Sequence, residues 1–115
     1  MKLLTEREEQ VRLVARFLME EYGVSNLNLT FRRMKKTLGQ FSNGRQQIKL
    51  STYFIANKSY RIIINTILHE IAHALTPGQG HNKLWKDKAE ELGALPKARA
   101  NDTERLKWIQ TKEDK

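Results

Sequence analysis

The stretch Ser59–Leu75 reads SYRIIINTILHEIAHAL, and the organisation of this 115-residue chain follows from it. Its apolar residues recur at helical spacing in a broad stripe, which predicts a largely buried helix. Within it, residues 69–73 form an H-E-x-x-H motif with His69 and His73 at its ends. Residues four apart lie on one face of a helix, so both imidazoles can reach one ion. Glu70 projects from the same side, which is typical of hydrolases in which zinc activates a water and a carboxylate takes its proton.

A third histidine follows at a spacing that suits the same ion. His81 lies eight residues after His73, beyond the turn Pro77–Gly80 and at the start of a helix predicted over Asn82–Leu92. Gly93 provides the stop of that helix. Zinc in a catalytic site takes three protein ligands and leaves one position open for water. The predicted metal ligands for Zn²⁺ are therefore His69, His73 and His81, and the predicted catalytic base is Glu70.

Other residues near the motif have less defined roles. Trp85, one turn after His81, is expected to pack against the ligand helix and hold His81 in place. Asn65, one turn before His69, either lines the cleft or is solvated on the helix surface. Tyr53 and Tyr60 could donate to an oxyanion, and nothing in the sequence selects between them.

The composition describes one ordinary domain. Hydrophobic residues make up 39% and charged residues 30% of the chain, and there is no cysteine, which excludes disulfides and Cys-ligated zinc. The N-terminal residues do not have the pattern of a secretory signal, and no apolar stretch approaches the roughly 20 residues of a membrane span. A cytoplasmic protein without a membrane partner is the expectation.

The net charge of +8 comes from one block of the sequence. Between Glu21 and Glu70 there is no acidic residue and there are eight basic ones, whereas the rest of the chain has 13 of each. A positive field of this kind attracts polyanions, so DNA is a predicted partner of the block 32–61; a solvated basic face is the alternative. The predicted nucleic-acid-binding residues are Arg32, Arg33, Lys35, Lys36, Arg45 and Lys49, and Lys58 and Arg61 complete the block.

The remaining patterns predict an α+β fold. A helix over Thr5–Tyr22 begins with a capping box and ends at Gly23. Alternating apolar residues predict strands over 27–32, 36–41 and 45–50, with a hairpin turn at Asn43-Gly44. We expect a small three-stranded antiparallel sheet, followed by the H-E-x-x-H helix and a second ligand-bearing helix. Residues 97–115 are expected to form a C-terminal extension, partly helical or frayed.

Several of these segments resemble the SprT-like family of zinc metalloproteases, in its short single-domain form without a Cys-rich zinc ribbon. The segments are Asn65–Leu75 with Gly80–Trp85, and upstream Thr37–Phe41 with Ile48–Ser51. The resemblance covers about Leu3–Pro96 and implies a zincin-like minimal metalloprotease domain over residues 1–96. It also implies the three histidines as zinc ligands and Glu70 as the catalytic residue. Eukaryotic members cut proteins crosslinked to DNA, which implies a DNA-associated protein substrate.

The sequence is consistent with three functions. The leading hypothesis is a zinc-dependent endopeptidase acting on intracellular proteins, including DNA-associated ones, with Glu70 moving the proton of a zinc-activated water. The alternative is a nucleic-acid-binding module with a structural or vestigial zinc site, against which the presence of Glu70 argues. A metal-dependent nuclease is the third, although nucleases more often use paired metals held by carboxylates.

Overall fold

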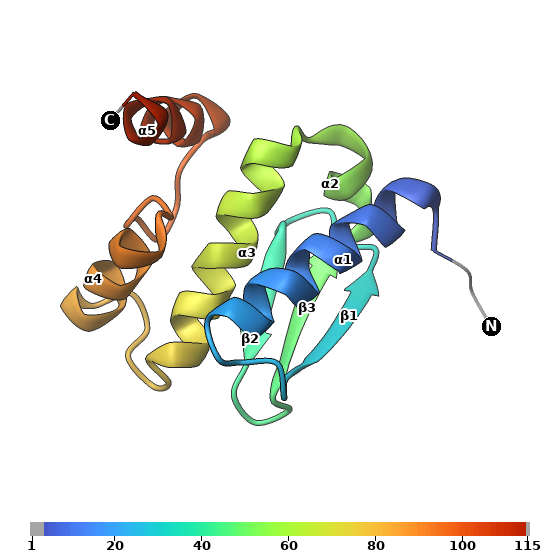
Figure 1. Ribbon diagram of the computed structural model, residues 1–115, viewed down its shortest axis with the longest axis horizontal. Helices are drawn as coiled ribbons and strands as arrows, with labels where there is room; N and C mark the ends of the chain where they lie inside the picture. The colour runs from blue at the N-terminus through green and yellow to red at the C-terminus, as the bar shows by residue number, and fades with distance from the viewer. Residues whose placement is uncertain (1–3, 115) are drawn as a thin grey trace.

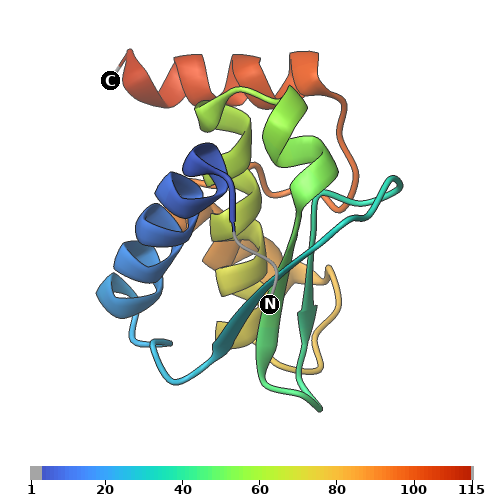
Figure 2. The ribbon, with the colours of Figure 1, turned by 90° about the vertical axis from the view of Figure 1, so that its right-hand side faces the viewer.

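Two helices cover one face of a three-stranded sheet, and two more helices flank them (Figure 1). The computed structural model describes residues 4–114. In both views α1 and α3 lie on the same side of the sheet, and α4 and α5 lie beyond α3 (Figure 1, Figure 2). No helix in the described part of the chain is long and apolar enough to cross a membrane. The elements are α1 (Glu6–Glu21), β1 (Asn28–Arg32), β2 (Gly39–Ser42), β3 (Gln47–Ser51), α2 (Thr52–Asn57), α3 (Tyr60–Leu75), α4 (Lys83–Leu92) and α5 (Asp102–Glu113).

The first helix begins as its sequence predicts. The Thr5 hydroxyl accepts a hydrogen bond from the Glu8 amide at 3.1 Å, and the Glu8 carboxylate accepts one from the Thr5 amide at 3.1 Å. Val11, Ala15 and Met19 are fully buried, because their spacing puts them on one face of α1. That face packs into the core shared with α3 and β3.

The predicted three-stranded antiparallel sheet is wrong: the sheet is mixed. Its order is β1-β3-β2, with β1 parallel to β3 and β2 antiparallel to β3. The strand with the most buried apolar side chains takes the centre, since Ile48 and Leu50 of β3 are 0% and 2% exposed. Alternation in the sequence reveals that a segment is extended, but it does not reveal which strand lies beside it.

A buried serine holds the connection that makes the sheet mixed. The Ser51 hydroxyl donates to the Met34 carbonyl at 2.5 Å and accepts from the Met34 amide at 3.4 Å. It also accepts from the Phe54 amide, so the same oxygen caps α2. The segment between β1 and β2 is thereby tied to the end of β3. The helix α2 (Thr52–Asn57) was not predicted, because TYFIAN has no helical apolar stripe.

The predicted hairpin between β2 and β3 is confirmed, although its turn is longer. The loop covers residues 43–46, and the residue with positive φ is Gln46, at 48°, rather than Gly44. The side-chain amide of Gln46 donates to the Asn43 carbonyl at 2.6 Å and to the Asn43 side-chain oxygen at 2.9 Å. These bonds offset part of the cost of the left-handed backbone at Gln46.

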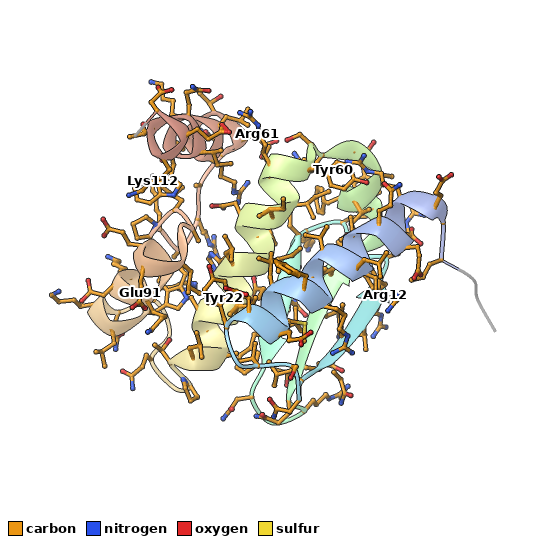
Figure 3. The ribbon with its side chains drawn as sticks, in the orientation of Figure 1. Arg12, Tyr22, Tyr60, Arg61, Glu91 and Lys112 are labelled. Atoms are coloured by element: carbon orange, nitrogen blue, oxygen red, sulfur yellow. The ribbon has the colours of Figure 1, made fainter. Side chains whose placement is uncertain are left out.

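The segment 97–115, expected to be partly helical or frayed, contains the helix α5. Asn101 caps this helix, which continues to Glu113. Two ion pairs join α5 to the region around the start of α3: Lys58 with Asp102 at 2.5 Å, and Arg61 with Glu113 at 2.7 Å. Arg61 extends from the first turn of α3 toward α5 (Figure 3). Tertiary contacts thus support a helix whose own apolar pattern is weak.

Candidate metal centre

Three imidazoles meet at one point beside α3. His69 and His73 lie one turn apart on α3, and His81 comes from the turn before α4. The Nε2 atoms of His73 and His81 are 3.0 Å apart, and those of His81 and His69 are 3.4 Å apart. Tetrahedral zinc with bonds of about 2.0–2.1 Å places its ligand nitrogens about 3.3 Å apart. The three side chains therefore fit one tetrahedral ion and leave a fourth position open.

The turn between α3 and α4 brings His81 close to His69 and His73. Gly78 and Gly80 have φ of 80° and 57°, in the left-handed region that favours glycine. Asn82 then caps α4 by accepting from the Trp85 amide at 3.2 Å. His81 is thus placed between a tight turn and a helix start, as the sequence predicted.

The indole ring of Trp85 packs against the rings of all three histidines. Its side chain is fully buried, and its ring centroid lies 4.7, 5.1 and 4.6 Å from the rings of His69, His73 and His81. Its indole N–H donates to the His69 carbonyl at 3.4 Å. The expectation that Trp85 packs on the ligand helix and holds His81 agrees with these contacts. One aromatic ring thus packs against all three imidazoles, and we expect it to restrict their rotamers.

Burial keeps the imidazoles neutral. Desolvation, followed by the charges of His73, His81 and Arg105, lowers the pKa of His69 to about 3. Desolvation, followed by the charge of His81, lowers the pKa of His73 to about 4, and desolvation also lowers the pKa of His81. Neutral imidazoles present free lone pairs, which is the form that binds a metal.

Glu70 is buried beside the cluster. Its side chain is 6% exposed, and burial raises its pKa to about 8. Glu70 and His73 line two cavities that follow one another along β2. A cleft of about 700 Å³ borders residues 36–39, and a smaller one of about 350 Å³ borders residues 40–42. Among the described residues, Glu70 and His73 are the two that line both cavities.

Gly39 lets β2 approach Glu70 closely. A Cβ at this position would lie 3.0 Å from Cγ2 of Thr66 and 3.4 Å from Cγ of Glu70. Sequence reasoning did not assign Gly39, although a glycine inside a strand pattern is a signal of close backbone approach. This glycine sets the spacing between the edge strand and the helix that carries the motif.

We expect Gly39→Ala to impair both stability and activity. The added methyl overpacks the contact with Thr66 and Glu70, so unfolding should become easier by about 1–3 kcal/mol in urea titrations. Gly44→Ala is the matched control, because a Cβ there meets nothing within 4 Å and should change stability by less than about 0.5 kcal/mol. Equal stability of the two variants would show that β2 does not pack tightly on α3.

The structure also shows where Asn65, Tyr60 and Tyr53 lie relative to the histidine cluster. Asn65 is buried and lines the larger cleft, and its side-chain oxygen accepts from the Leu95 amide at 3.0 Å. The Tyr60 hydroxyl hydrogen-bonds to Gln10 on α1 (Figure 3). Tyr53 lies beside Phe54 and Arg33. Neither tyrosine lines either cavity at the cluster, so neither is placed to donate to an oxyanion there.

The residues of the basic block do not form one cluster. The segment after β1, the hairpin loop and β3 each carry some of them, so they spread along the sheet. Lys58 and Arg61 are paired with acids of α5. Two members border the cavities: Lys36 lines the larger cleft and Lys49 the smaller. Of the predicted nucleic-acid residues, Arg32 ends β1, Arg33, Lys35 and Lys36 follow it, Arg45 lies in the hairpin loop, and Lys49 lies on β3.

Comparison with solved structures shows the class of fold. The metallopeptidase zymogen of Methanocaldococcus jannaschii jannalysin matches with a TM-score of 0.65 and 15% identity, over 90% of this chain and 93% of that one. The zymogen of Pyrococcus abyssi abylysin matches with a TM-score of 0.63 and 18% identity, over 91% and 96%. The chain therefore has a minimal metallopeptidase-like fold with a cluster of three histidines.

The family is shown by the sequence itself. The SprT-like family matches residues 8–105, most of the chain and the whole region from α1 to the first turn of α5. The chain belongs to the SprT-like family. No curated protein matches it.

Proposed function

We propose that this protein is a zinc-dependent endopeptidase that cleaves peptide bonds of intracellular proteins. The observation that carries the proposal is a buried carboxyl group, Glu70, beside three imidazoles that fit one tetrahedral ion. Family membership and the likeness to two proteins described as metallopeptidase zymogens support it.

His69, His73 and His81 would hold the ion. When bound, zinc supplies a Lewis acid that polarises a carbonyl and acidifies water. Glu70 then accepts a proton from water and delivers it to the leaving amine. A carboxylate suits both steps, because it accepts the proton from water and, once protonated, can give it to the amine.

An extended peptide fits the space beside the cluster. β2 lies at the edge of the sheet, with β3 as its only strand neighbour in the described chain, and its residues border both cavities. An edge strand can pair with an extended chain through backbone hydrogen bonds. Since the two cavities meet at Glu70 and His73, a chain lying along β2 would have residues on both sides of the reacting bond. This arrangement favours cleavage within a chain.

We further propose that the substrates include proteins associated with DNA. Arg33 and Lys35 after β1 and Arg45 on the hairpin loop are exposed and supply positive charge outside the cleft. They would raise the local concentration of a DNA-bound substrate by long-range attraction.

The test is proteolysis by the zinc-loaded protein, with a histone and an unfolded protein as substrates, each with and without single-stranded DNA. We expect cleavage that stops with a chelator and returns when zinc is added. Acceleration of histone cleavage by DNA would support the DNA-associated substrate. Absence of cleavage, together with bound zinc and intact DNA affinity, would favour the nucleic-acid-binding module.

A further inference from the structure

We propose that the cleft selects peptide segments that carry an acidic side chain next to the reacting bond. This inference rests on the proposed peptidase function and adds the substrate class. It comes from the charges that line the larger cleft, and two of these belong to the C-terminal part of the chain, outside the basic block seen in the sequence.

The walls of the cleft are positive. Three cations line it, namely Lys36, Arg99 and Arg105, and the only acid among its lining residues is Glu70. Even as a carboxylate, Glu70 offsets only one of these three charges, so the lining stays net positive. Lys36 and Arg99 are exposed, and neither has an ion-pair partner within 4.0 Å in the described part of the chain.

Arg105 is the most enclosed of the three cations. Its side chain is 19% exposed and donates to Asp102 at 3.0 Å, which is its one side-chain hydrogen bond among the described residues. A guanidinium has five N–H donors, so most of them stay available to a second carboxylate. Asp102 also pairs with Lys58 at 2.5 Å, so one carboxylate serves two cations and leaves net positive charge at this end of the cleft.

The segment that carries the arginines is part of the wall. The Leu95 amide donates to the Asn65 side chain on α3 at 3.0 Å, and the Trp108 indole donates to the Gly93 carbonyl at 2.9 Å. Lys97 pairs with Glu104 across the same loop. These bonds hold the loop and α5 to α3 and to the end of α4, where Arg99 on the loop and Arg105 on α5 line the cleft.

An acidic peptide fits this environment better than a basic one. Asp and Glu side chains accept hydrogen bonds from guanidinium groups in a geometry that neutral residues cannot reproduce. Lysine or arginine in the same place would face like charges in a partly enclosed cleft. The smaller cavity also contributes a cation, Lys49, so the field is positive on both sides of Glu70.

The first experiment measures kcat/KM for quenched fluorescent peptides. One neutral host peptide carries Glu, Gln or Lys at each position around the cleavage site in turn. At the best position we expect Glu to exceed Gln by about tenfold and Lys to fall below Gln. Arg99→Glu should remove most of the advantage of Glu over Gln, because one cation of the wall becomes an acid. Lys107→Glu is the control, since Lys107 is exposed on α5 and outside the cleft, and it should keep the wild-type order.

The second experiment measures binding without turnover. Fluorescence anisotropy with the zinc-loaded Glu70→Gln protein should give tighter binding of the Glu peptide than of the Gln peptide, and the difference should shrink at high salt. Glu70-dependent cleavage with equal kcat/KM for all three peptides would overturn the inference and leave the peptidase standing. Cleavage of no peptide would count against the peptidase itself. Arg99-dependent binding of a single-stranded oligonucleotide, with no preference among the peptides, would assign the cleft to nucleic acid instead.

Discussion

Glu70→Gln is expected to lower kcat for peptide hydrolysis by about a thousandfold or more while zinc binding persists. The amide has the same size and shape as the carboxyl group, but it cannot accept a proton from water. The side chain does not touch the ion in the proposed site, because the three imidazoles hold it. The measurement is kcat on an unfolded protein substrate, with bound zinc quantified by equilibrium dialysis.

The stability of the metal-free protein also depends on the Glu70 carboxyl group, which gives a second measurement on the same variant. The pKa of Glu70 is about 8 in the folded metal-free protein, above its ordinary value of 4.5. The unfolded chain therefore releases this proton more readily, and the metal-free protein loses stability as pH rises from about 4.5 to 8. A neutral amide removes that loss, so the metal-free Glu70→Gln protein should be at least as stable as the wild type at pH 7.

Glu90→Gln is the matched control, because Glu90 is exposed on α4 and makes no ion pair in the described chain. It makes the same chemical change away from the cluster and should leave hydrolysis unaltered. If Glu70→Gln hydrolysed peptides as fast as Glu90→Gln, Glu70 would not be the group that moves the proton.

Local signals explain why so much of the helical structure and the histidine cluster could be predicted. Capping residues lie next to the helices they start, as with Ser59 before α3 and Asn82 before α4. The spacing of His69 and His73 is likewise a property of one helix, and only a short turn separates His81 from them. Such features depend on neighbours within a few residues, so a pattern in the sequence is enough to reveal them.

The features that could not be predicted depend on contacts between distant segments. The place of β3 between β1 and β2 depends on its burial and on the Ser51 bond to Met34, seventeen residues earlier. Arg105 reaches the cleft from α5, which is joined to the start of α3 by the ion pair between Lys58 and Asp102, forty-four residues apart. Neither contact has a periodic pattern, and each appears only once the whole chain is packed.

Trp85→Ala is expected to destabilise the metal-free protein by about 3–5 kcal/mol, because it removes a large, fully buried ring from the core. The same ring packs against all three imidazoles and bonds to the His69 carbonyl. Its loss should therefore also weaken zinc affinity by about 10–100-fold, as the loss of groups that orient metal ligands usually does. Urea titration of the metal-free protein and competition with a zinc indicator measure the two effects separately.

Two further variants separate packing from metal binding. Leu84→Ala is the control, since Leu84 precedes Trp85 on α4 but is 59% exposed, and it should change stability by less than about 0.5 kcal/mol. Trp85→Phe keeps one aromatic ring against the histidines and loses the second ring and the indole N–H, so it should be more stable and bind zinc more tightly than Trp85→Ala. Wild-type zinc affinity in a folded Trp85→Ala protein would mean that the α3 backbone and the Gly78–Gly80 turn orient the imidazoles without the ring. Reduced affinity that Phe restores would show instead that one buried side chain joins the stability of the core to the geometry of the metal centre.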